Sequence, residues 1–200
     1  MNNRLIAVLA GLLCLASTVT MAQNEAADDS TGLPGDNFSL ESALEMFKRA
    51  STPEEFEKLL NTPDNHVNNL DLNGDGEVDY VRVVGKKNSN AHAFVLQVPV
   101  SATENQDVAV IELEKTGESS AVVQIIGDED IYGEQKIVEP KGEGEDSGNE
   151  GDANEGGGPS AGTWATASPI VVVNVWGWPC VRYVFSPAYV VWVSPWRWAV

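Results

Sequence analysis

The sequence predicts an α+β domain in which two N-terminal helices pack on a four-stranded antiparallel meander. Two segments within residues 40–60 have apolar residues at helical spacing, and four runs between residues 78 and 126 are rich in β-branched and apolar residues. The first three connections are short, which favours pairing of consecutive strands. Two helices that cover one face of such a sheet give the layered α+β arrangement.

Both expected helices begin with capping signals. The first, residues 40–50, follows Ser39 as its N-cap. The second, residues 53–60, follows Thr52, with proline at its first helical position and Glu55 completing a capping box. The apolar positions expected to face the sheet are Leu40, Ala43, Leu44, Phe47, Phe56, Leu59 and Leu60.

The expected strands are residues 78–84, 91–100, 108–114 and 121–126. Gly85 and the polar residues after it are expected to end the first strand, and Ile137-Val138 offers an additional edge strand. In a meander, residues 71–79, 101–107 and 128–130 should lie at one end of the sheet. This placement suggests that Asp107 or Glu104 completes a metal shell or binds a second ion there.

The segments around this domain, residues 37–139, differ from it in composition. Residues 1–22 are typical of a cleaved secretory signal, with Arg4, an apolar stretch and a small-residue cleavage site. Leu12-Leu13 before Cys14 argues against lipidation. Residues 23–36 are expected to form a disordered leader and residues 140–162 an acidic, glycine-rich disordered linker. We expect an exported protein, in the periplasm, at the outer-membrane surface or outside the cell.

Charge and residue inventory restrict the function. The chain has 30 Asp and Glu against 12 Lys and Arg, a net charge of -18, which repels nucleic acid and favours divalent cations. Its two histidines, His66 and His92, lack zinc-site spacing, and no nucleophile or phosphate-binding motif is found. We expect a protein without enzymatic activity; a hydrolase of envelope polymers is the distant alternative.

Residues 163–200 form a chemically distinct tail. They contain all six tryptophans, four prolines, two arginines and no Asp or Glu. Three short strands at 170–176, 180–185 and 189–193 are expected, with Cys180 buried. Three interpretations stay open: the tail covers the open face of the sheet, contacts a protein partner or membrane surface, or binds a glycan. The candidate binding residues are Trp176, Trp178, Tyr189, Trp192, Trp196 and Trp198.

Residues 71–79, DLNGDGEVD, have the pattern of a metal-binding loop. Asp71, Asn73, Asp75 and Asp79 place oxygens at positions 1, 3, 5 and 9, and Gly76 permits the sharp turn at position 6. The backbone carbonyl of Glu77 can also point into the loop. Calcium prefers six to eight such oxygen ligands. An ordinary Asn/Gly-rich turn is the alternative, although it does not require oxygens at all four positions.

These nine residues resemble the calcium loops of dockerin modules, thrombospondin type 3 repeats and FG-GAP repeats. The resemblance implies side-chain ligation by Asp71, Asn73, Asp75 and Asp79, and backbone ligation by Glu77. It departs from EF-hands at position 12, where Arg82 replaces the bidentate glutamate and a strand is expected in place of a helix.

The order of segments along the whole chain is similar to that of uncharacterised exported bacterial proteins. We therefore expect a secreted envelope protein with a structural calcium loop and an aromatic interaction segment. The alternative is a module that binds a glycan, a membrane surface or an envelope protein through the tail, with the metal incidental.

Overall fold

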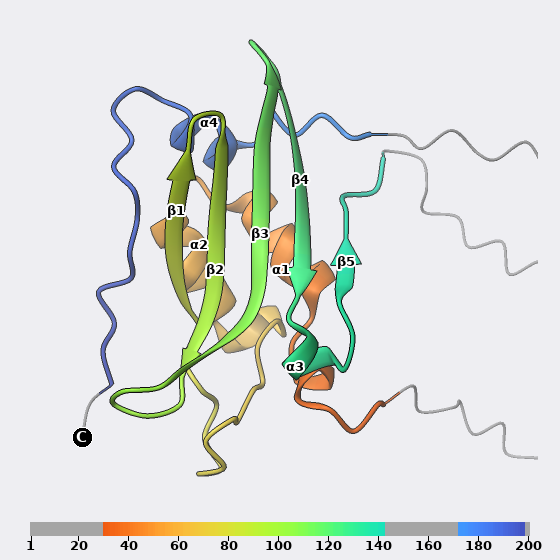
Figure 1. Ribbon diagram of the computed structural model, residues 1–200, viewed down its shortest axis with the longest axis vertical. Helices are drawn as coiled ribbons and strands as arrows, with labels where there is room; N and C mark the ends of the chain where they lie inside the picture. The colour runs from red at the N-terminus through yellow and green to blue at the C-terminus, as the bar shows by residue number, and fades with distance from the viewer. Residues whose placement is uncertain (1–29, 143–171, 199–200) are drawn as a thin grey trace, which may run out of the picture.

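The computed structural model describes residues 30–142 and 172–198, which form an antiparallel sheet with helices on one face (Figure 1). The sheet has five strands in chain order, so the predicted meander is confirmed and the predicted count of four is corrected. The fifth strand is the Ile137-Val138 run, which pairs with Ile126 and Ile125. The strands are β1 (Arg82–Asn88), β2 (Ala91–Pro99), β3 (Asn105–Gly117), β4 (Ser120–Gly127) and β5 (Lys136–Val138).

The two predicted helices, α1 (Leu40–Arg49) and α2 (Pro53–Leu60), are confirmed. The Ser39 hydroxyl accepts a hydrogen bond from the Ser42 N–H at 3.1 Å, as expected of an N-cap. The Thr52 hydroxyl likewise accepts one from the Glu55 N–H at 3.1 Å. The other helical elements are η1 (Pro34–Asn37), η2 (Pro63–Asn65), α3 (Glu129–Tyr132) and α4 (Pro179–Val184).

The hydrophobic core lies between the helices and one face of the sheet. Phe47 of α1 is at its centre, with its ring centroid 5.3 Å from Phe56, 5.6 Å from Phe94 and 6.3 Å from Trp178. One buried side chain thus contacts the second helix, the sheet and the C-terminal segment. Alternate strand residues complete this layer: Val83, Leu96, Ile111, Leu113, Ala121, Val123 and Ile125.

The first strand begins four residues later than predicted and continues through Gly85. Asn88 pairs with Ala91, so only two residues form the turn to β2. Before β1, the Val81 N–H donates to the Asn61 side chain rather than to a neighbouring strand. Gly85 does not end the strand but pairs with Phe94 of β2. A Cβ atom at this position would lie 2.7 Å from the Trp192 carbonyl oxygen. Its glycine permits close approach of the C-terminal segment.

The C-terminal segment, residues 172–198, differs from the predicted three strands. Residues 179–184 form α4, with Pro179 at its start and Cys180, Val181 and Val184 buried at helical spacing. Packing overrides the β propensity of this stretch, because the Cys180 N–H donates to the Ala50 carbonyl after α1. As predicted, Cys180 is buried, and burial raises its pKa to about 12.

The C-terminal segment packs on the side of the sheet that α1 and α2 occupy, and then runs along β1 (Figure 1). It therefore does not cover the opposite face, as one interpretation of the tail expected. Along β1 it forms a single antiparallel bridge, Val84 to Val193, with hydrogen bonds from the Gly85 N–H to the Trp192 carbonyl and from the Ser194 N–H to the Val83 carbonyl. Several core residues thus come from a segment distant in sequence.

The expected segment boundaries agree only in part with the described residues. Pro34–Asn37 forms η1 and Gly35 is buried, inside the stretch expected to be a disordered leader. The ordered part of the chain therefore begins before residue 37. The expected signal, residues 1–22, and most of the expected linker, residues 140–162, lie outside the described residues.

Candidate functional site

The predicted metal-binding loop is attached to the core at both ends. Leu70 before it is fully buried and Asp79 at its end is 7% exposed. The Asp79 N–H donates to the Leu70 carbonyl at 2.7 Å, which closes the loop at its base. The Asn68 amide also donates to the Asp79 carbonyl at 2.7 Å. The loop is therefore held in place by the folded domain.

Asp71 organises the backbone of the loop. Its carboxylate accepts hydrogen bonds from the N–H groups of Gly74, Asp75 and Gly76 at 2.8, 3.1 and 2.9 Å. Gly74 and Gly76 have φ angles of 75° and 86°, in the left-handed region that glycine adopts readily. The glycines and the first aspartate of the pattern thus specify one compact turn.

Asn73 brings the remaining predicted side-chain ligands together. Its amide nitrogen lies 3.0 Å from Asp75 Oδ2 and 3.1 Å from Asp79 Oδ1. A polar hydrogen-bond donor thus lies between two carboxylates, where a cation would also be attracted. Rotation of this amide by 180° would turn its oxygen toward the same place and make a third oxygen ligand, with loss of the hydrogen bond that Oδ1 accepts from the Asp75 N–H at 2.8 Å.

The electrostatics of Asp79 favour a cation. Burial is the main cause that raises the pKa of Asp79 above its ordinary value, and the charges of Asp71 and Asp75 add to it. Hydrogen bonds from Leu72 and Asn73 act in the opposite direction. The folded loop therefore keeps an acidic group where its ionised form is penalised, and a bound cation would offset that cost.

The full ligand set is not preassembled. Among residues 30–142 and 172–198, no three His, Cys, Asp or Glu side chains are grouped so that they alone could hold a metal ion. Glu77 is exposed, in keeping with a residue that would contribute only its backbone carbonyl. Calcium at this loop would need the Asn73 amide oxygen and the Glu77 carbonyl as well as the aspartates.

The expected neighbours of the loop are only partly present. The loop, the β2–β3 connection and α3 lie at the same end of the sheet (Figure 1). However, the Asp107 carboxylate accepts a hydrogen bond from Gln97 of β2, and no hydrogen bond between Asp107 and the loop is found among the described residues. The neighbour that sequence reasoning missed is Asp36, which lines a hollow of about 370 Å³ together with Asp71. Asp36 is the last residue of the stretch expected to be a disordered leader, so the sequence offered no signal that it lies near Asp71.

The aromatic residues predicted for ligand binding make contacts within the chain. Trp176 stacks on Phe185, with Lys115 Nζ 4.9 Å from its ring centroid, and Trp178 packs against Phe47. Tyr189 is 8% exposed. Trp196 stacks on Tyr80 with ring centroids 5.2 Å apart, and Trp198 is partly buried. These contacts hold the C-terminal segment to the domain.

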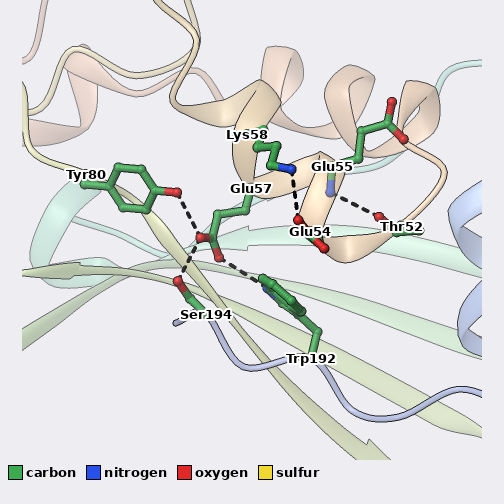
Figure 2. A network of polar contacts seen from close by, with 8 residues as sticks. All are labelled: Thr52, Glu54, Glu55, Glu57, Lys58, Tyr80, Trp192 and Ser194. Carbon is green, nitrogen blue, oxygen red and sulfur yellow. Dashed lines mark hydrogen bonds and ion pairs between the residues drawn. The ribbon is translucent and has the colours of Figure 1, made fainter. Parts of the chain in front are cut away.

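Glu57 of α2 is a buried carboxylate that sequence reasoning assigned no role. Figure 2 shows that Tyr80, Trp192 and Ser194 point toward it. Glu57 Oε1 accepts hydrogen bonds from the Tyr80 and Ser194 hydroxyls at 2.9 and 2.7 Å. Its Oε2 accepts from the Val83 N–H at 2.8 Å and Trp192 Nε1 at 3.3 Å. One carboxylate thus joins α2, β1 and the C-terminal segment.

His92 is a second buried polar group at the contact with the C-terminal segment. It is 3% exposed, and its ring packs against Phe185 and Tyr189 at centroid distances of 4.9 and 5.4 Å. Within the described residues, Nε2 has no hydrogen-bond partner. Burial, with a smaller effect from the charge of Lys87, lowers the pKa of His92 to about 4.

This burial predicts an acid-sensitive fold. Between the ordinary His pKa of 6.5 and the folded value of about 4, the unfolded chain binds more protons at this site, so stability falls as pH falls. The loss should reach about 3 kcal/mol near pH 4. Denaturant unfolding of the parent and of His92→Leu measures it. The difference in unfolding free energy should move in favour of the variant from pH 7 to pH 4; a constant difference would contradict the assignment.

Comparison with known proteins found no matching family model, curated protein or solved structure. In the described part of the chain, no helix has the length and apolar character required to span a membrane. The functional interpretation therefore depends on the chemistry of the loop and on the packing of the C-terminal segment.

Proposed function

We propose that this chain is an exported, non-catalytic envelope protein whose 71–79 loop binds one calcium ion that stabilises the fold. The observation that supports calcium most directly is the Asn73 amide between the carboxylates of Asp75 and Asp79. Asp71 and the backbone carbonyl of Glu77 would complete the protein ligands. The ion would offset repulsion among the three aspartates, which otherwise opposes closure of the loop.

Export is proposed from residues 1–22, which combine a positive start, an apolar stretch and a small-residue cleavage site. Outside the cell, a structural calcium site functions even with a dissociation constant of roughly 10⁻⁴–10⁻³ M. The position of the loop between buried Leu70 and Asp79 favours a fixed structural ion over a sensor. An ion bound by Asp79 would fix the backbone conformation of the residues that lead into β1, which begins at Arg82.

The alternative function, recognition of a glycan, membrane surface or envelope protein through the aromatic tail, has less support. The rings of Trp176, Trp178 and Trp196 contact Phe185, Phe47 and Tyr80 of the same chain. A glycan platform needs aromatic faces that are free for the ligand. The contacts of these rings favour a role of the segment in stability.

Calcium should raise the melting temperature of the protein, and a chelator should lower it. At a calcium concentration 100 times the dissociation constant, the added stability is about 2.7 kcal/mol, which corresponds to a shift of several degrees. Calorimetric melting of residues 23–200 with calcium and with chelator measures this effect. Asp75→Ala should abolish the difference, because it removes a ligand and the acceptor of the Glu77 N–H.

Two controls make the melting experiment specific. A double variant, Glu104→Ala with Asp107→Ala, should keep the full calcium response, because Asp107 is hydrogen-bonded to Gln97 and not to the loop. Magnesium at the same concentration should have a smaller effect, since it requires near-ideal octahedral geometry. An unchanged melting temperature in calcium would leave the loop as an ordinary turn.

A further inference from the structure

A continuous row of β-branched residues crosses the sheet from edge to edge. Val84 of β1 lies opposite Val95 of β2, Val95 opposite Val110 of β3, and Val110 opposite Ile126 of β4. The row extends at both ends, because Ile126 pairs with Ile137 of β5 and Val84 is bridged to Val193 of the C-terminal segment. We call these six residues the apolar row: Val193, Val84, Val95, Val110, Ile126 and Ile137.

The apolar row lies on the face opposite the helices. Side chains alternate between faces along a strand, and the neighbouring residues Val83, Phe94 and Ile125 point into the core. None of the elements formed by residues 30–142 and 172–198 covers this open face, which is turned toward the viewer in Figure 1. The ends of the row are well exposed, with Val193 at 55% and Ile137 at 52%, whereas Val95 in its middle is only 4% exposed. Val84, Val110 and Ile126 are half-buried.

Polar side chains border the apolar row on both sides. On one side, Lys86, Glu112 and Gln124 are each two positions along their strand from a residue of the row. The Gln124 amide donates a hydrogen bond to Glu112 at 2.9 Å. In the other direction, Arg82 donates to Gln97, and Gln97 donates to Asp107. An apolar stripe with a polar border is the usual composition of a protein interaction surface.

An acidic hollow adjoins the row on the same face. It has a volume of about 450 Å³ and is lined by Glu112, Glu114 and Glu139, together with Lys86 and Lys87. Three carboxylates against two ammonium groups favour a basic side chain in this hollow. The chain as a whole carries a net charge of -18, which attracts a cationic partner from a distance and repels a second copy.

We propose that the apolar row binds a basic amphipathic helix of another protein. Six residues at a strand spacing of about 4.8 Å span about 24 Å, the length of about 16 helical residues. The apolar side of the helix would cover the exposed parts of the other five residues of the row on either side of buried Val95. A Lys or Arg of the helix would enter the hollow beside Glu112 and Glu114. This surface is independent of the calcium loop, which lies at the end of the sheet.

A pair of synthetic helical peptides tests the surface directly. One peptide of about 18 residues carries leucine on one side and lysine on the other, and its control replaces every lysine by glutamate. Fluorescence anisotropy at about 0.15 M salt, where distant charges are screened, measures binding to the full chain. The lysine peptide should bind at least ten times more tightly than the glutamate peptide. Equal binding of both, or none by the lysine peptide, would overturn the proposal.

Matched variants separate the apolar row from general charge attraction. Val84→Thr with Val110→Thr keeps the charge and should weaken binding at least ten-fold, whereas Val190→Thr, at an 82% exposed valine outside the row, should not change it. Glu112→Gln with Glu114→Gln removes two carboxylates of the hollow. Both side chains are exposed, so the fold should be kept, and binding should weaken several-fold. Binding of the lysine peptide at full strength by both double variants would refute the proposal. Analytical sedimentation gives a second test: if the parent and Val190→Thr form dimers but Val84→Thr/Val110→Thr does not, the partner is a second copy of this chain and not a basic helix.

Discussion

Removal of residues 172–200 should leave the remaining chain unfolded or aggregated at 25 °C. Among residues 172–198, five hydrophobic side chains are buried: Val175, Cys180, Val181, Val184 and Tyr189. At about 1.5–3 kcal/mol for each buried large apolar side chain, their loss amounts to about 10 kcal/mol, comparable to the whole stability of a typical domain. Circular dichroism in the near and far ultraviolet, with size-exclusion chromatography, measures the outcome.

Two single substitutions serve as controls for this truncation. Val172→Thr and Val190→Thr change valines of the same segment that are 68% and 82% exposed, so both should unfold at the denaturant concentration of the parent. A truncated protein that is soluble and unfolds cooperatively would contradict the packing role of the segment. It would also restore the interpretation of the tail as a binding surface.

Substitution of Glu57 by alanine should destabilise the protein by on the order of 4 kcal/mol. The change removes the acceptor for the Tyr80 and Ser194 hydroxyls, the Trp192 indole and the Val83 N–H. Buried donors without a partner cost about 1–3 kcal/mol each, although a hydroxyl can turn to another acceptor. Denaturant unfolding measures the change in free energy.

The matched control for Glu57 is one turn earlier on the same helix. Glu54 is exposed and pairs with exposed Lys58 at 2.9 Å, so Glu54→Ala should cost less than about 1 kcal/mol. Glu57→Gln keeps the volume but replaces one acceptor oxygen with a donor, and its cost should be intermediate. If Glu57→Ala and Glu54→Ala were equally stable, the buried carboxylate would not hold the C-terminal segment in place.

Elements with strong local signals could be predicted from sequence. Ser39 and Thr52 specified the helix starts, and the short turns specified the order of the strands. The beginning of β1 and the helical state of residues 179–184 depend on distant contacts. From sequence alone, Gly85 suggested the end of a strand, because its close contact with the Trp192 carbonyl cannot be read locally. Likewise, Pro179 begins a helix that packs beside α1, with a hydrogen bond from the Cys180 N–H to the Ala50 carbonyl.

The candidate site shows the same division between local and distant information. The nine-residue pattern indicated which side chains lie together, since Asn73, Asp75 and Asp79 are close in sequence and the Asn73 amide contacts both carboxylates. Glu57 was missed because a glutamate in an acidic helix is normally exposed. Its position did contain a signal: Pro53, Phe56, Glu57 and Leu60 form one stripe at helical spacing, and all four are buried.

Isothermal titration of calcium into residues 23–200 tests the central claim most directly. The proposal predicts one saturable site with a dissociation constant of about 10⁻³ M or tighter, unchanged in Glu104→Ala/Asp107→Ala and absent in Asp75→Ala. No binding heat at several times that concentration, in a protein that is folded by circular dichroism, would contradict the assignment of the loop to calcium.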